Sequence, residues 1–234
     1  MINRPILSSL LCAVVLTFSS ALVQARDFLI EVVVFESLTD KSLTSGGLSY
    51  PRIVNNLRLG SEEAVAAGFL PMEQNLTLTE HAASIAQSGR YRFLRHLAWR
   101  QPGLDADNAK AVRVALGNPI EMYISQDRDR SSEFYPATPS PTPDNTQSIN
   151  SFTVNGTISV RLGRFLHMDT RLVFTDEQTG RSYNLGQSRK MRSGELHYID
   201  NPRFGILTQI TPLEDSAGAS NEAESSETAV TAPE

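Results

Sequence analysis

The hydrophobic pattern changes period several times along the chain, and each change predicts a different element. Residues 27–36 (DFLIEVVVFE) form a nearly continuous β-branched and aromatic run, interrupted by Glu31. A strand that is apolar on both faces is typical of the centre of a sheet that is covered on both sides. Residues 37–76 show weak periodicity, so we expect a long loop there, within which 61–67 are compatible with a short helix.

A helix and a second strand are predicted next. Residues 78–88 carry an apolar stripe at helical spacing, and the preceding Thr77-Leu-Thr-Glu80 has the pattern of a capping box. From residue 91 the period becomes two, which predicts a strand at 91–100. One face of that strand is expected to carry Tyr91, Phe93, Leu97 and Trp99.

The C-terminal half has the clearest alternation. Apolar and polar residues alternate strictly from Phe152 to Leu162, which predicts an amphipathic strand with one solvent-exposed face. Similar patterns predict strands at 111–116, 164–175, 182–191 and 204–211. We therefore predict an α+β fold: a mostly antiparallel sheet with one main helix packed on it.

Composition divides the chain into five parts. The first 25 residues combine Arg4, an apolar run and Ala25, which predicts a secretory signal peptide that is cleaved after Ala25 and takes the single cysteine, Cys12, with it. Residues 213–234 contain six acidic and no basic residues and little to bury, so we expect a disordered acidic tail. The expected parts are a signal peptide at 1–25, an N-terminal strand–helix–strand part at 26–117, a Pro-, Ser- and Thr-rich linker or loop at 118–151, a C-terminal antiparallel β part at 152–212, and the tail at 213–234.

Charge and motifs exclude several functions. Once the leader and the tail are set aside, residues 26–212 contain 20 acidic and 20 basic residues. A neutral body gives no support to nucleic-acid binding, and no segment after the leader is apolar enough to span a membrane. A mature chain without a thiol excludes cysteine catalysis and thiolate metal ligation. The chain has no G-x-G-x-x-G, P-loop, H-E-x-x-H or G-x-S-x-G motif, so we expect no cofactor.

A ligand-binding surface is predicted around the basic run Arg189-Lys-Met-Arg192. If the polar faces of neighbouring strands align, several guanidinium groups converge beside an aromatic ring and a carboxylate. Guanidinium groups bind carboxylates such as those of peptide stems, and a tyrosine ring can pack against a sugar. The alternative is a solvated sheet face whose ion pairs contribute little. The candidate residues are Arg161, Arg171, Arg189, Arg192, Glu195, His197 and Tyr198.

No catalytic or metal-binding residues are predicted. His167 and Asp169 share one face of a strand but have no third ligand near them in the sequence. Ser193, His197 and Asp200 have the residue types of a triad, yet nothing nearby builds a strained elbow or an oxyanion hole.

Four segments of the chain resemble the sequence pattern of one known family. The segment from Gln187 to Pro212, QSRKMRSGELHYIDNPRFGILTQITP, closely resembles the terminal signature of the CsiV family of periplasmic peptidoglycan-binding proteins. Further matches are EVVVFE at 31–36, YRFLRHLAWRQP at 91–102 and GTISVRLGRFLHMD at 156–169. The resemblance implies a periplasmic accessory factor of cell-wall assembly that is associated with peptidoglycan, with cell shape and with an outer-membrane lipoprotein activator of a class A penicillin-binding synthase.

The leading hypothesis is therefore a non-enzymatic binding protein of the cell envelope. Two alternatives remain open. The first is a peptidoglycan-modifying hydrolase, which would have to use Glu195, Asp169 and Asp200. The second is an adaptor that binds only proteins, for which an exposed apolar patch would be the interaction site.

Overall fold

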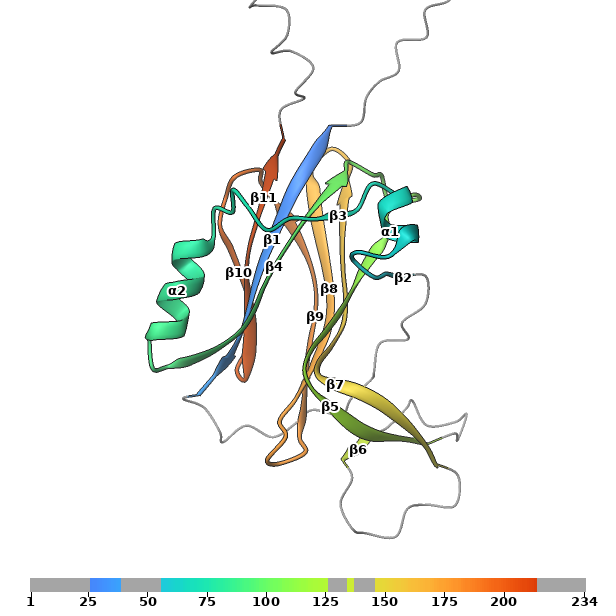
Figure 1. The fold of residues 1–234 in the computed structure, drawn as a ribbon, viewed down its shortest axis with the longest axis vertical. Helices are drawn as coiled ribbons and strands as arrows, with labels where there is room; N and C mark the ends of the chain where they lie inside the picture. Colours follow the sequence, from blue (N-terminus) through green and yellow to red (C-terminus); the bar gives the residue numbers. More distant parts are fainter. Residues whose placement is uncertain (1–25, 39–55, 126–133, 137–145, 214–234) are drawn as a thin grey trace, which may run out of the picture.

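The described part of the chain folds into two β-sheets that face each other, with a helix on the outer side of one sheet (Figure 1). The computed structural model describes residues 26–38, 56–125, 134–136 and 146–213. The expected signal peptide at 1–25 lies outside these residues, as does nearly all of the expected tail at 213–234. No helix among the described residues is long and apolar enough to cross a bilayer.

The first sheet, within the described residues, has five strands in the order β10-β11-β1-β4-β3, and every pair in it is antiparallel. Its strands are β1 (Asp27–Ser37), β3 (Leu70–Pro71), β4 (Tyr91–Pro102), β10 (His197–Asn201) and β11 (Phe204–Pro212). β1 lies in the centre and is buried on both faces, which confirms the prediction from its unbroken apolar run. β10 was not predicted.

The second sheet, again within the described residues, has the order β2-β5-β7-β8-β9, with β6 paired to β5. Its strands are β2 (Asn56–Leu57), β5 (Ala111–Ser125), β6 (Phe134–Pro136), β7 (Thr146–Leu162), β8 (Leu166–Thr175) and β9 (Ser182–Met191). β2 and β5 are parallel, and the other pairs are antiparallel. A mostly antiparallel arrangement was expected, but as one sheet; the structure instead divides the strands between two sheets.

The main core lies between the two sheets. The inner faces, those that each sheet turns toward the other, contribute Ile30, Val32 and Trp99 from the first sheet and Ile158 and Leu172 from the second. All five side chains are fully buried. The N-terminal and the C-terminal part of the chain therefore fill one core together, because strands of both parts turn an apolar side toward it. The expected division of the chain into two such parts remains a prediction.

Helix α2 (Thr79–Gln87) packs on the outer face of the first sheet, where Leu78 and Ala82 meet Val33. The predicted helix at 78–88 is thus confirmed. The expected capping box is not what starts it: the N-cap residue is Leu78, and it makes no side-chain capping hydrogen bond. The carboxylate of Glu31, from β1, accepts the backbone N–H of Thr77 at 2.8 Å and that of Leu78 at 3.0 Å. A shorter helix, α1 (Glu62–Ala66), is capped by Ser61, whose Oγ accepts the N–H of Ala64.

A β-bulge reverses the faces of β4 relative to the sequence prediction. The register between β1 and β4 shifts at Val34/Phe35, so that Val34 pairs with Arg95 while Phe35 pairs with Phe93. Trp99 consequently points into the main core, whereas Phe93 lies on the outer face. Simple alternation had placed both aromatic residues on one face, which is wrong because a bulge inserts one extra residue.

Strands β5 and β7 are longer than their apolar patterns. β5 was expected at 111–116 but extends to Ser125, and β7 begins at Thr146, so both enter the segment 118–151 that was expected to be a linker or loop. A register shift between Leu116 and Pro119 interrupts the alternation and hides this continuation. Figure 1 shows the far ends of β5 and β7, together with β6, projecting away from the two sheets. The Pro-rich stretch at 137–143 lies outside the described residues.

Candidate functional site

The connection from β9 to β10 brings five of the seven candidate residues together. The chain leaves the second sheet after Met191 and enters the first sheet at His197. Gly194 has a φ of +75°, which L side chains rarely adopt, and its N–H donates to the carbonyl of Ile210 at 2.8 Å. This turn carries Arg192 and Glu195 and places Arg189 beside Tyr198.

Side chains of β9 hold the edge of the second sheet against the edge of the first. Nη1 of Arg189 donates to the carbonyl oxygen of Tyr198 at 2.9 Å. Nε2 of Gln187 donates to the carbonyl of Asp200 at 3.3 Å. We call this junction, formed by β9, the turn and β10, the β9–β10 seam. Because these bonds satisfy backbone groups of β10, the strand has a defined position at the seam.

Charges at the turn are arranged around His197. Arg192 and Glu195 form an exposed ion pair, with Nη1 3.3 Å from Oε1. The pKa of His197 is lowered, first by burial and then by the positive charge of Arg189, while Glu195 opposes the shift. Nε2 of His197 accepts the backbone N–H of Arg192 at 3.5 Å, which requires an unprotonated ring nitrogen. The contact and the lowered pKa both favour the neutral imidazole.

Tyr198 presents a supported aromatic ring on the outer face of the first sheet. Its ring stacks on that of Phe35 with 5.9 Å between centroids and 15° between planes. Phe35 is buried and is held from the side by Tyr91. The pKa of the Tyr198 hydroxyl is raised by burial and by the charge and hydrogen bonding of Asp200, so the phenol stays neutral. Since 43% of Tyr198 is exposed, part of a rigid aromatic surface faces the solvent.

Arg161 and Arg171 lie elsewhere, on the outer face of the second sheet. Residues that pair across antiparallel strands share a face, and Arg161 pairs with His167, which pairs with Lys190. Arg189 is the next residue along β9, so it points to the opposite side of that sheet. The four arginines of the predicted surface therefore do not share one face. Whether any of the seven candidates binds a ligand remains a prediction.

Partners differ between the two outer-face arginines. Nε of Arg161 donates to Oδ2 of Asp169 at 3.1 Å. Arg171 is exposed and makes no ion pair within the described residues. Lys190 places Nζ 3.1 Å from the ring centroid of Phe165, an exposed aromatic residue of the β7–β8 turn that the sequence analysis did not identify. Its position in the Gly163-Arg164-Phe165 sequence between two predicted strands could have indicated an exposed aromatic residue.

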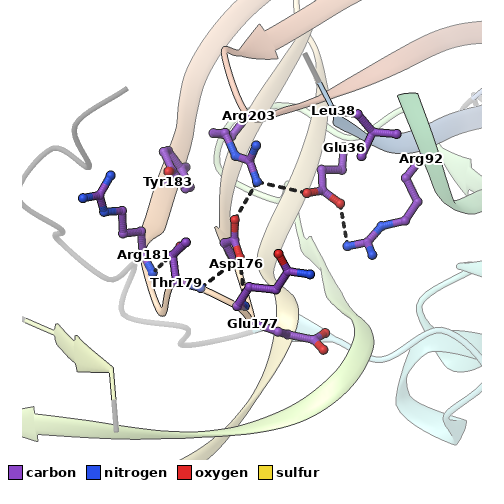
Figure 2. A pocket seen from close by; sticks show the side chains of 10 residues that line it. Glu36, Leu38, Arg92, Asp176, Glu177, Thr179, Arg181, Tyr183 and Arg203 are labelled. Atoms are coloured by element: carbon purple, nitrogen blue, oxygen red, sulfur yellow. Dashed lines mark hydrogen bonds and ion pairs between the residues drawn. The ribbon is translucent and has the colours of Figure 1, made fainter. Parts of the chain in front are cut away.

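A pocket of about 180 Å³ opens between the ends of β1 and β4 and the turn that joins β8 to β9. Its lining is mostly charged, and none of its residues was predicted as a site. Figure 2 shows the side chains, which come from four segments that are distant in the sequence. The lining residues are Glu36, Leu38, Arg92, Asp176, Glu177, Gln178, Thr179, Arg181, Tyr183 and Arg203.

A buried guanidinium organises this pocket. Nη2 of Arg203 lies 2.6 Å from Oδ2 of Asp176 and 3.1 Å from Oε1 of Glu36 (Figure 2). Nη2 of Arg92 approaches the other oxygen of Glu36, Oε2, at 2.5 Å. The two oxygens of Glu36 therefore each face one guanidinium group. The Arg203 side chain is only 2% exposed, so its two carboxylate partners are needed to offset its desolvation.

Glu177 is kept ionised by its neighbours. The hydroxyl of Thr153 donates to Oε1 at 2.5 Å, and Nδ2 of Asn118 donates to Oε2 at 3.0 Å. These two hydrogen bonds, with that of Thr153 the larger effect, lower the pKa of the Glu177 carboxyl. A carboxyl with a lowered pKa is a poor general acid near neutral pH, so this group acts as a fixed negative charge. No group of three or more His, Cys, Asp or Glu among the described residues is placed to hold a metal ion.

Comparison with known proteins identifies a family for the chain. A family model described as "Peptidoglycan-binding protein, CsiV" matches residues 6–213 of the chain. No curated protein and no solved structure matches the chain.

Proposed function

The chain belongs to the CsiV family of peptidoglycan-binding proteins, and from this membership we propose that it is a non-enzymatic accessory protein of cell-wall assembly that acts in the periplasm. We propose that it contacts peptidoglycan at the β9–β10 seam. Peptidoglycan offers sugar rings, which pack on aromatic faces, and peptide carboxylates, which bind guanidinium groups. The seam offers both partners within one short segment of the chain.

The observation that carries this proposal is the stacking of Tyr198 on Phe35. An exposed aromatic ring that is supported from beneath loses little freedom when a flat ligand packs on it, so binding costs less entropy. Arg189 lies against the backbone of the same tyrosine, and Arg192 is exposed a few residues before it. The arrangement suits a glycan strand with its attached peptide.

A passive role is supported by the positions of the acids that a hydrolase would need. Asp169 lies on the outer face of the second sheet, and Asp200 lies on the outer face of the first. Packed sheets are about 10 Å apart, so side chains on the two outer faces are separated by more than that. Glycosidase carboxylates stand roughly 5–9.5 Å apart, which these two cannot match. Glu195 is paired with Arg192 in the turn.

We further propose that the protein acts with an outer-membrane lipoprotein that activates a class A penicillin-binding synthase, and that it thereby promotes wall synthesis and maintains cell shape. The support for this partner is the resemblance of residues 187–212 to the family signature. Leu196 is 45% exposed beside Tyr198 and offers an apolar contact for a protein. Site-specific crosslinking from Leu196 in cells tests the partner. If Leu196 crosslinks to another protein while the purified chain does not bind isolated cell walls, the protein-only adaptor is favoured.

Sedimentation with purified sacculi tests the binding function. The wild-type protein should sediment with the sacculi. Tyr198→Ala should bind them with a dissociation constant about tenfold higher, since an aromatic contact contributes roughly 1.5 kcal/mol. Phe152→Ala is the matched control, because Phe152 is also an exposed aromatic residue but lies on β7, outside the seam. Wild-type protein that stays wholly in the supernatant at low salt contradicts the proposal.

The same sacculi distinguish a binding protein from a hydrolase. After prolonged incubation the supernatant should contain no soluble muropeptides above the level of a buffer control. Release of muropeptides that depends on the protein would replace the binding role with an enzymatic one.

A further inference from the structure

The outer face of the first sheet carries a row of residues that crosses four strands beside the seam. Asp200 of β10 pairs with Gly205 of β11, and Gly205 pairs with Phe35 of β1. Phe35 in turn pairs with Phe93 of β4. Figure 1 shows these four strands side by side. Because residues that pair across antiparallel strands share a face, Phe93 lies on the same outer face as Tyr198, on the other side of Phe35.

Gly205 leaves room for the contact between Phe35 and Tyr198. It lies on β11, the strand between the two that carry these rings. A Cβ at Gly205 would lie 3.1 Å from Cζ of Phe35, closer than ordinary van der Waals contact. Without that Cβ, the two rings meet over β11 and stack with 5.9 Å between their centroids. Aromatic side chains from two strands that are not neighbours thus form one continuous surface.

Three aromatic rings reach the solvent around the buried Phe35. Tyr198 is 43% exposed and Phe93 is 37% exposed. Tyr91 is partly buried and packs edge-on against Phe35, with 5.1 Å between centroids. Tyr91 lies on the outer face because its pairing partner, Ser37, is two residues after Phe35 along β1. We call Tyr91, Phe93 and Tyr198, with Phe35 beneath them, the aromatic platform.

A carboxylate stands at the seam end of the aromatic platform. Asp200 is two residues after Tyr198 on β10, so both side chains lie on the outer face. Burial raises the pKa of the Tyr198 phenol most, and the nearby carboxylate of Asp200 and hydroxyl of Tyr91 raise it further. Asp200 is exposed and forms no ion pair within the described residues. Since a carboxylate has about four acceptor sites, Asp200 can accept further hydrogen bonds from a ligand.

These groups match an uncharged ligand that has apolar ring faces and many hydroxyl groups. The C–H faces of sugar rings pack on aromatic rings, and sugar hydroxyls donate hydrogen bonds to carboxylates. The negative charge of Asp200 repels the carboxylates of stem peptides, which favours the neutral sugars here. Peptidoglycan, the ligand that the family description names, contains such sugars.

The width of the aromatic platform calls for more than one sugar. β10 and β4 are three strand spacings apart, roughly 14 Å, and the rings of Phe35 and Tyr91 lie between them. A single sugar ring is about as large as one aromatic side chain, so it cannot cover both Tyr198 and Phe93. A chain of linked sugars that crosses the strands can.

We propose that the aromatic platform binds the glycan strand of peptidoglycan across β10, β11, β1 and β4, with successive sugar rings on Tyr198 and Phe93 and a sugar hydroxyl on Asp200. The inference rests on the proposed function, since it takes peptidoglycan as the ligand. It adds that this face binds sugars and not stem peptides, and that affinity rises with the length of the glycan. The stem carboxylates are left to Arg189 and Arg192.

Calorimetry and NMR titration of the purified protein with two peptide-free sugars test the inference. Tetra-N-acetylchitotetraose is an uncharged β-1,4-linked tetramer of N-acetylglucosamine, and N-acetylglucosamine is the single unit. We expect the tetramer to bind at least about tenfold more tightly than the monomer and to shift amide signals of both β10 and β4. Equal affinity for the two sugars, or no binding of the tetramer, overturns the inference.

Phe93→Ala tests the part of the aromatic platform that lies outside the seam. It should weaken binding of the tetramer about fivefold and leave binding of the monomer on Tyr198 unchanged. Phe152→Ala is the matched control, because Phe152 is 36% exposed but lies on β7 in the second sheet. Equal affinity of these two variants for the tetramer contradicts the proposed platform.

Asp200→Ala tests the hydrogen bond to the sugar. It should weaken binding of the tetramer about tenfold, because a charge-assisted hydrogen bond is lost. Asp107→Ala is the matched control: it removes the same charge from an exposed position in the connection between β4 and β5. If both variants bind the tetramer as the wild type does, the assignment of Asp200 is wrong.

Sedimentation with sacculi separates this inference from the proposed function. Protein that sediments with sacculi but does not bind the tetramer retains the proposed function and loses the platform assignment. Protein that binds the tetramer but does not sediment with sacculi retains the platform assignment and loses the proposed function.

Discussion

The carboxylate of Glu31, in the middle of β1, accepts a hydrogen bond from the backbone N–H of Leu78 at 3.0 Å. The same carboxylate accepts the N–H of Thr77 and contacts Nε2 of His96 at 3.1 Å. The N–H groups of the two residues that lead into α2 thus find their acceptor on the central strand. One buried acid therefore both caps the helix and holds it against the sheet.

Glu31→Gln should lower the free energy of unfolding by about 2–4 kcal/mol, because the amide nitrogen cannot accept these bonds and buried donors lose their partner. Glu80→Gln, in the exposed first turn of the same helix, should cost less than about 1 kcal/mol. Urea denaturation of both variants measures the difference. Similar values for the two would mean that Glu31 does not cap the helix.

Gly156→Ala should destabilise the protein by more than about 3 kcal/mol or prevent folding. Gly156 has a φ of +149°, and a Cβ placed there would lie 1.9 Å from the carbonyl oxygen of Arg171 on the neighbouring strand. Gly163→Ala is the control, since a Cβ at that position meets nothing within 4 Å. Thermal unfolding monitored by circular dichroism compares the two, and a native-like melting temperature for Gly156→Ala would contradict the close approach of β7 and β8.

Arg203→Met should cost about 3–5 kcal/mol of stability, because it leaves Glu36 and Asp176 buried without their shared cation. Arg92→Met should cost less than about 1 kcal/mol, since the Arg92 side chain is largely exposed. The two variants have the same chemistry and differ in burial. An equal decrease in the free energy of unfolding for both variants, measured by urea denaturation, would show that burial does not determine how much these ion pairs stabilise the protein.

The pKa of His197 should rise in Arg189→Gln, because a nearby positive charge is removed. NMR titration of the imidazole signals measures this shift directly. In the wild type the folded-state pKa lies below the usual value of 6.5. The corresponding stability is complete above 6.5 and is lost as the pH falls through the folded-state pKa, because the unfolded state then binds the proton more strongly. The loss of stability at low pH should be smaller in Arg189→Gln. An unchanged pKa of His197 in this variant would contradict the electrostatic effect of Arg189 on the imidazole.

Arg189→Ala combined with Arg192→Ala should weaken retention on sacculi about tenfold. Thermal stability should stay nearly intact, since both side chains are exposed. Arg58→Ala combined with Arg164→Ala removes the same charge from exposed positions outside the seam. A double Arg189/Arg192 variant that no longer folds would assign these arginines to the structure and not to binding.

Elements with strong periodicity could be predicted from the sequence. The apolar run of 27–36, the helical stripe at 78–88 and the alternation of 152–162 led to β1, α2 and most of β7. β10 was missed because its five residues are polar at three positions and too few to show a period. The reversed faces of β4 depend on a bulge, which alternation cannot reveal.

The candidate site was predictable only where it is local in the chain. Arg189, Arg192, Glu195, His197 and Tyr198 lie within ten residues, so a single turn brings them together. Whether Arg161 shares their surface depends on strand register, and the structure places it on another face. The pocket joins residues from β1, β4, the β8–β9 turn and the β10–β11 turn, and this tertiary combination has no signature in any one segment.

The pairing of β1 with β11 has a consequence for the order of folding. Thr208 donates to the carbonyl of Glu31 across 177 residues of chain, and β1 has β11 on one side and β4 on the other. Closing so large a loop costs conformational entropy, and folding is slower when the contacting residues are far apart in the sequence. During synthesis β1 therefore lacks one of its two neighbouring strands until residues 204–212 have been delivered, and the open edge of this apolar strand can pair with other chains until then.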